Sequence, residues 1–213
     1  MAGGAIDRLL RILHLRTLEE SLALLDKLRK NVRLVLLVEE AGQAGAVREY
    51  VKTLEEKSKG KITVEVLTVK LPETTPPPCL GAAMGEKRFT YCGDLPPPLF
   101  PVVVQFVLAL GGAPAFRCLE VNPPPADITL FVVSGLPCII TGYTLAEYLY
   151  CAPQASVTII NAETLNRRAG RKVISAVPTL VINKAHVHVG SVMSLKELVK
   201  ILEVKSRGGG EGA

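Results

Sequence analysis

Hydrophobic and polar positions change their period several times along the chain, and each change marks the boundary of an element. The first half has the order strand, loop, helix, strand, proline-rich segment, strand and helix. We expect strands at 32–38 and 62–69, an edge strand at 88–92, and helices at 46–59 and 99–110. Residues 72–78 are rich in proline and predict no regular structure.

The second half repeats this order. We expect strands at 128–133, 156–161, 179–182 and 186–189, a turn at 134–138, and helices at 139–151, 162–169 and 194–204. Pairing Pro78 with Pro178 and Gly93 with Gly190 aligns the two halves. The resulting unit of about 95 residues is typical of a duplicated domain.

The N-terminal segment 5–30 carries leucines at helical spacing and predicts an amphipathic helical region. Thr17 followed by Glu20 predicts a capping box, which would divide this region into two helices. The segment lacks the apolar core of a signal peptide. The glycine-rich tail 206–213 predicts disorder.

Hydrophobic residues make up 48% of the chain, which is ample for a packed core. The longest apolar segment, 99–110, contains Pro101 and Gln105 and is shorter than the roughly 18 residues of a membrane helix. It therefore predicts a buried helix. We expect a cytoplasmic protein that has no membrane partner.

The charge is moderate and evenly spread, because 25 basic and 20 acidic residues give a net charge of +5. Aromatic residues make up only 5% of the chain, so we expect no nucleic-acid partner. Many charged residues and 15 prolines are typical of a heat-adapted protein. In such organisms, disulfides also occur inside cells.

The five cysteines form no C-x-x-C pair, which argues against a zinc ribbon and against a secreted disulfide scaffold. They are Cys79, Cys92, Cys118, Cys138 and Cys151. Cys79 and Cys92 flank the hairpin of the first half, where a disulfide between them or with Cys118 is one alternative. We favour the other alternative, in which each is a plain thiol.

A clear resemblance lies in the segment Ala-Val-Pro-Thr-Leu-Val-Ile at 176–182, followed by His-Val-Gly at 188–190 and Leu-Lys-Glu-Leu at 195–198. It resembles the Val-Pro-Thr segment of the thioredoxin fold, with a cis-proline at Pro178, a hairpin glycine and a last helix. With its duplication, the chain resembles the archaeal two-domain protein disulfide oxidoreductases, also described as glutaredoxin-like.

This resemblance implies an α/β fold built from a tandem pair of thioredoxin-like domains, each a mixed sheet of about four strands flanked by helices. The first domain would span 1–111, with a leading helix and without the second helix, because the chain between Val69 and Pro78 is too short for it. A linker would span 112–127 and the second domain 128–205.

In the family, each redox site is a C-x-x-C motif that opens a helix. The helix N-terminus lowers the pKa of the first thiol, and the second thiol resolves the mixed disulfide. The corresponding residues in the first half, Gly42-Gln43-Ala44-Gly45, include no nucleophile. In the second half they are Leu136-Pro137-Cys138-Ile139, in which Cys138 is displaced by one position.

Two functions follow from these positions. The first is a non-catalytic or weakly redox-active relative that binds a protein or peptide partner, for which the resemblance implies a backbone edge at Val177 and Pro178. The alternative is a disulfide oxidoreductase with Cys138 as its single catalytic thiol. Cys151 lies too far along the same helix to resolve a disulfide with Cys138. If Leu136 and Ile139 form an apolar surface, the protein could also associate into an oligomer.

His186 and His188 alternate, so they share one face of a strand and could begin a metal site. No cysteine or carboxylate cluster accompanies them in the sequence. We therefore expect a solvated edge strand here, and we expect neither a metal nor a cofactor. The sequence also lacks the glycine-rich phosphate-binding motif of nucleotide-binding proteins.

Overall fold

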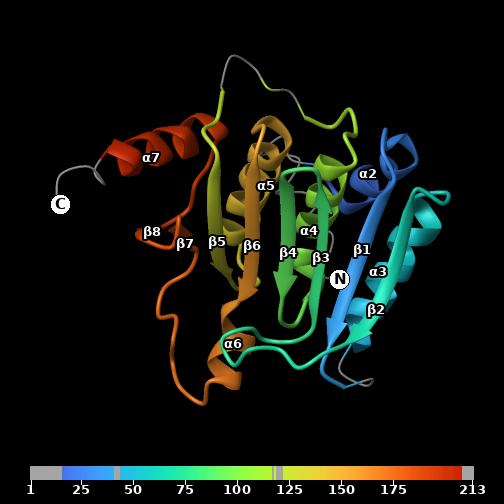
Figure 1. Ribbon diagram of the computed structural model, residues 1–213, viewed down its shortest axis with the longest axis horizontal. Helices are drawn as coiled ribbons and strands as arrows, with labels where there is room; N and C mark the ends of the chain where they lie inside the picture. Colours follow the sequence, from blue (N-terminus) through green and yellow to red (C-terminus); the bar gives the residue numbers. More distant parts are fainter. Residues whose placement is uncertain (1–15, 41–43, 117, 119–121, 208–213) are drawn as a thin grey trace.

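The computed structural model describes residues 16–40, 44–116, 118 and 122–207 (Figure 1). Its strands are β1 (Val32–Val38), β2 (Ile62–Thr68), β3 (Cys79–Met84), β4 (Lys87–Cys92), β5 (Ala126–Val132), β6 (Ala155–Asn161), β7 (Thr179–Ile182) and β8 (His186–Val189). They form one mixed sheet in the order β2-β1-β3-β4-β6-β5-β7-β8. The fold is therefore α/β with a continuous eight-stranded sheet.

Each half contributes four strands with the same topology. In the first half, β1 pairs parallel with β2 and antiparallel with β3, and β3 pairs antiparallel with β4. In the second half, β5 pairs parallel with β6 and antiparallel with β7, and β7 pairs antiparallel with β8. The repeated order of strands that the sequence predicts is thus present.

The two halves share one sheet because β4 pairs in parallel with β6 along its whole length. The expectation of two sheets of about four strands was therefore wrong, and β4 is an interior strand and not an edge strand. Pairing between strands that belong to different repeats depends on tertiary register, which no local pattern encodes. The strand β3 was not predicted from the sequence, because its small residues have low strand propensity.

The helices are α2 (Leu18–Leu22), α3 (Gly45–Lys57), α4 (Phe100–Leu110), α5 (Leu136–Cys151), α6 (Ala162–Arg168) and α7 (Leu195–Arg207), with 3-10 turns η1 (Leu25–Lys27) and η2 (Pro97–Leu99). In Figure 1, α2, α3, α4 and α5 lie behind the sheet, so they cover one of its faces. We call the face toward the viewer the open face. Among the described residues, α6 is the helix nearest its lower end.

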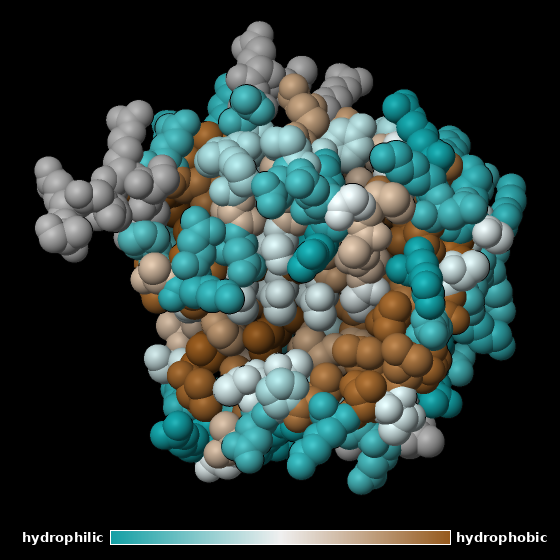
Figure 2. All heavy atoms as spheres, viewed as in Figure 1, coloured by the Kyte–Doolittle hydropathy of each residue, from teal (hydrophilic) through white to brown (hydrophobic). Residues whose placement is uncertain are grey.

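Side chains alternate between these two faces. On β1, one set of alternate side chains is buried toward the helices: Val32, Leu34, Leu36 and Val38. The other set lies on the open face: Arg33, Val35 and Leu37. β5 and β6 alternate in the same way. Figure 2 shows this face, where hydrophobic side chains gather toward the lower end of the sheet.

The core centres on α4 and α5, which pack against each other behind the sheet. Every residue of α4 is buried, which confirms the predicted buried helix. A Cβ atom at Gly142 of α5 would lie 2.5 Å from Cγ1 of Val102, so the close approach of the two helices requires glycine there. None of the helices in the described part of the chain has both the length and the hydropathy to cross a membrane.

The predicted capping box at the start of α2 is confirmed. The Glu20 N–H donates to Thr17 Oγ1 at 3.3 Å, and the Thr17 N–H donates to the Glu20 carboxylate at 2.8 Å. The Gln105 side chain of α4 donates to Ser21 Oγ at 2.6 Å and ties α2 to the core. Residues 5–15 of the predicted helical region, and the tail from 208, lie outside the described residues.

Candidate functional site

The candidate site of the second half lies where β5 ends and α5 begins. α5 starts at Leu136, earlier than the sequence indicated, because Pro137 fits the first turn of a helix. Cys138 therefore lies within that first turn. It is a free thiol with 2% of its surface exposed, and it belongs to the main hydrophobic core.

Burial controls the chemistry of this thiol. Desolvation raises the pKa of Cys138, and hydrogen bonds with the backbone of Val133 and Gly135 offset only part of this effect. The Val133 N–H donates to the sulfur at 3.5 Å. A helix N-terminus normally favours the thiolate, whereas desolvation is the largest cause acting on the pKa of this thiol and raises it. The thiol is therefore protonated at neutral pH and shielded from a protein substrate.

Pro178 directly precedes β7 and follows a cis peptide bond, as the resemblance implied. Its carbonyl accepts a hydrogen bond from the Gly190 N–H at 3.0 Å, which closes the hairpin. Val177 is half-buried and precedes the strand. Among the described residues, neither the N–H nor the C=O of Val177 has a hydrogen-bond partner.

The first half contains the same cis-proline and hairpin hydrogen bond at Pro78. The Pro77–Pro78 bond is cis, and the Gly93 N–H donates to the Pro78 carbonyl at 2.9 Å. The pairing of Pro78 with Pro178 and of Gly93 with Gly190 is thus confirmed. However, Pro77 has no N–H, so this edge lacks the donor that Val177 keeps.

The counterpart of the redox motif in the first half is only partly described. Gly42 and Gln43 lie outside the described residues, Ala44 caps α3 and Gly45 is its first residue. Ala44 is buried. The described half of this motif therefore contributes no reactive side chain.

Four of the five cysteines form disulfides, which corrects the expectation of plain thiols. Cys79 pairs with Cys92 directly across β3 and β4, and Cys118 pairs with Cys151 at the end of α5. The first of these bonds is buried beneath Leu71 and Leu37. Sequence motifs did not predict these two disulfides, because strand pairing or tertiary packing brings the cysteines of each pair together.

The two histidines share one face of β8, which is an edge strand as predicted. They lie opposite Ile182 and Leu180 on the half-buried face, whereas the valines of β8 are more than half exposed. The strand is thus a partly exposed edge strand as expected, with the valines more exposed than the histidines. Within the described ranges, no three potential metal ligands come together.

Sequence reasoning missed an ion pair that joins the two halves at the lower end of the open face. The two terminal guanidinium nitrogens of Arg168, Nη2 and Nη1, donate to the Glu39 carboxylate at 2.8 and 2.9 Å. The same carboxylate accepts the Leu71 N–H at 3.0 Å. These contacts lower the pKa of Glu39 to about 2, with the hydrogen bond from Arg168 as the largest cause.

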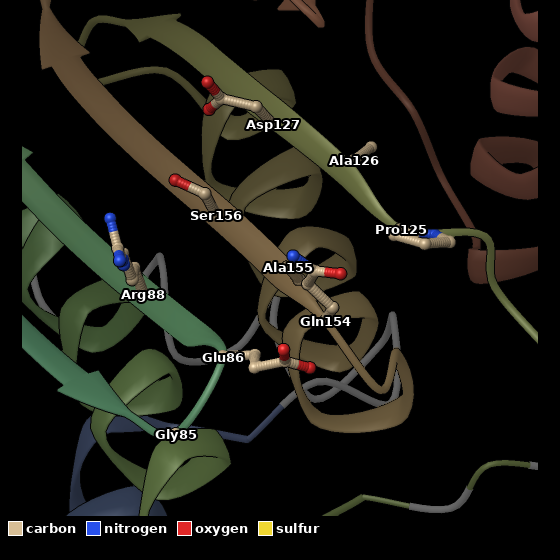
Figure 3. Close-up of a pocket in the computed structure, with 9 residues that line it drawn as sticks. All are labelled: Gly85, Glu86, Arg88, Pro125, Ala126, Asp127, Gln154, Ala155 and Ser156. Atoms are coloured by element: carbon tan, nitrogen blue, oxygen red, sulfur yellow. The ribbon is translucent and has the colours of Figure 1, made fainter.

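A polar cavity of about 460 Å³ lies at the opposite end of β5 (Figure 3). Arg88, Ser156 and Asp127 are neighbours there on β4, β6 and β5. Glu86 and Gln154 complete its polar lining. This cavity brings together both signs of charge but none of the residues that the sequence singled out.

No protein-family model and no curated protein matches the chain. Solved structures do match it. The alkylhydroperoxide reductase component AhpF of Enterococcus faecalis is 16% identical, with a TM-score of 0.70 over 86% of this chain and 96% of that chain. The protein disulfide oxidoreductase of Aeropyrum pernix is 13% identical, with a TM-score of 0.64 over 89% of this chain and 92% of that chain.

A third structure, of a Sulfolobus solfataricus protein, is 14% identical, with a TM-score of 0.50 over 86% of this chain and 96% of that chain. These likenesses establish the fold. It is thioredoxin-like, and one of these neighbours is a protein disulfide oxidoreductase. The likeness spans both halves of the chain.

Proposed function

We propose that this protein binds an extended segment of a partner protein at the backbone edge formed by Val177 and Pro178, and that it carries out no thiol–disulfide exchange. The unpartnered backbone of Val177 carries this proposal. A peptide that adds itself to such an edge gains main-chain hydrogen bonds with the Val177 N–H and C=O. The buried Pro178 and the Gly190 hydrogen bond hold that edge in place.

The alternative, a single-thiol oxidoreductase using Cys138, has weaker support. A nucleophilic thiol has to be ionised and accessible. The surroundings of Cys138 favour neither property, because the thiol lies in the core and burial raises its pKa. Leu136 and Ile139, which replace the two motif cysteines, have no nucleophilic atom.

We further propose that the chain consists of two thioredoxin-like domains, 1–111 and 128–205, joined by 112–127. The repeated topology of the sheet supports this division. We also propose a cytoplasmic protein of a heat-adapted archaeon. The charged, proline-rich composition and the two disulfides support that assignment, because such organisms retain disulfides inside cells.

The first test is an NMR titration of the 15N-labelled full chain. The probe is a neutral, acetylated and amidated heptapeptide of alternating serine and valine, which has no charge to direct it elsewhere. We expect the largest amide shifts at Val177, Thr179 and Gly190. Saturable shifts confined to other segments would contradict the proposal.

The second test is reduction of insulin by dithiothreitol, followed by turbidity, with the wild type beside Cys138→Ser. We expect both proteins to give the rate of dithiothreitol alone. An accelerated rate that disappears in Cys138→Ser would establish the single-thiol alternative instead.

A further inference from the structure

The open face carries a groove of about 1310 Å³ near its lower end, which we call the open-face groove. Its floor consists of Thr129 and Phe131 on β5 and Ile160 on β6. One wall is the loop that includes 73–75, and the other is formed by the segment 169–173 after α6. The groove coincides with the hydrophobic lower end of the face in Figure 2.

The dimensions of the groove favour a chain segment over a small molecule. Its volume exceeds the 300–1000 Å³ or so of ordinary small-molecule pockets. Thr129 and Phe131 are two residues apart on one strand, so side chains on the floor of the groove are spaced about 7 Å apart. Alternate side chains of an extended peptide have the same spacing. Phe131 and Ile160 are direct neighbours across β5 and β6 and offer a half-buried apolar surface to them.

The charge on the rim indicates the character of the occupant. Arg168 is neutralised by Glu39. Arg171 and Lys184 are exposed, and neither has a charged or hydrogen-bonding partner among the described residues. The facing wall carries one carboxylate, that of Glu73, so these two cations leave the rim with a positive charge. Val173, between the basic rim and the floor, has 47% of its surface exposed.

We propose that the open-face groove binds an extended segment of a partner protein in which apolar side chains alternate with acidic ones. The apolar side chains pack on Phe131 and Ile160, while the acidic ones meet Arg171 and Lys184. This site is distinct from the backbone edge at Val177 and does not depend on binding there.

The chain's own ends do not match this chemistry. The segment 1–15 contains Arg8 and Arg11 with a single acidic residue, Asp7, so its charge has the same sign as the rim. The segment 208–213 contains no large apolar residue. A partner chain of opposite charge is therefore the better complement.

The test measures fluorescence anisotropy of a labelled heptapeptide of alternating glutamate and leucine, titrated with the full chain. The double variant Arg171→Glu/Lys184→Glu reverses the charge of the two basic residues on the rim of the groove. Its matched control, Arg88→Glu/Lys196→Glu, makes the same change of net charge at exposed positions outside the groove. A peptide with lysine in place of glutamate controls for peptide charge.

We expect the wild type and the control variant to bind the acidic peptide with similar Kd values. The rim variant should raise the Kd by about tenfold or more, and the lysine peptide should not bind measurably to the wild type. Absence of binding by the wild type, or equal weakening in both variants, would overturn the proposal. Equal binding of both peptides would do the same.

Two further measurements distinguish binding in the open-face groove from binding at the Val177 edge and from self-association. Val177→Pro should bind the acidic peptide as the wild type does, whereas the loss of binding in that variant would place the peptide at the other edge. Sedimentation velocity should give a monomer at the concentrations used. A dimer that the acidic peptide dissociates would show that a second copy of the chain occupies the groove, and would overturn the proposal.

Discussion

Glu39 and Arg168 lie 129 residues apart in the sequence and form a bidentate ion pair across the two halves of the chain. Each side chain has 22% of its surface exposed. Arg168 also donates to the Leu71 carbonyl at 3.2 Å, so α6 of the second half holds a loop of the first half. Both residues of the ion pair line the open-face groove, and Leu71 packs against the disulfide between Cys79 and Cys92.

We expect Arg168→Ala to lower the Tm, because it leaves the Glu39 carboxylate without its main partner. Glu39 has a pKa of about 2 in the folded protein, below its ordinary 4.5. A depressed pKa stabilises the folded state above the ordinary value, and this contribution is lost as the pH falls through the folded value. The Tm difference between wild type and variant should therefore be full at neutral pH and narrow between pH 4.5 and about 2.

The control is Arg167→Ala, which removes an exposed ion pair with Asp94. Exposed pairs contribute little, so its Tm should stay near that of the wild type at every pH. A Tm difference for Arg168→Ala that does not change with pH would contradict the role assigned to Glu39.

Removal of the Cys79–Cys92 disulfide should destabilise the fold. The bond closes a loop with a sequence separation of 13, for which loop entropy gives about 3 kcal/mol. We expect Cys79→Ser/Cys92→Ser to lower the free energy of urea unfolding by that amount. Alkylation of both thiols in the denatured, unreduced wild type would show that the bond does not form.

The packing of α4 on α5 predicts the outcome of Gly142→Ala. The new methyl group would overlap Val102, and overpacking of this kind costs roughly 1–3 kcal/mol, offset in part by about 1 kcal/mol of helix propensity. Val102→Ala makes room for it, so a double-mutant cycle from urea unfolding should show favourable coupling. Additive effects of the two changes would contradict the close approach.

Cys138 should react slowly with a thiol reagent in the folded protein. It is the one cysteine outside the two disulfides, it is buried, and burial raises its pKa. With 5,5′-dithiobis-(2-nitrobenzoate) at neutral pH, we expect labelling only as fast as the protein opens, and full labelling of one thiol in denaturant. Rapid labelling of the native protein would contradict a buried thiol.

Much of the fold could be predicted from the sequence, because strands such as β1 and β6 and helices such as α4 have strong periodic patterns. The Ala-Val-Pro-Thr segment predicted the cis bond at Pro178, which is confirmed. The junction of β4 with β6 could not be predicted, since pairing between repeats has no local signature.

The candidate site was less accessible to sequence reasoning. Burial of Cys138 depends on how α5 packs, and its position in the chain is equally compatible with an exposed thiol. The pair of Glu39 and Arg168 had no detectable signal, because the two residues are ordinary charges far apart in sequence. Pro77 and Pro78 are evident in the sequence. That Pro77 lacks the backbone N–H donor which Val177 has in the second half became clear only when the structure placed the two residues at equivalent positions.

The most direct test of the central claim is the affinity of the neutral serine–valine heptapeptide for Val177→Pro and Val177→Ala, measured by NMR titration. Val177→Pro removes the backbone donor and recreates the Pro-Pro sequence that the first half holds at 77 and 78. Val177→Ala keeps the donor and removes only the side chain. We expect the alanine variant to bind like the wild type and the proline variant not to bind. Undiminished binding by a folded Val177→Pro would contradict this expectation.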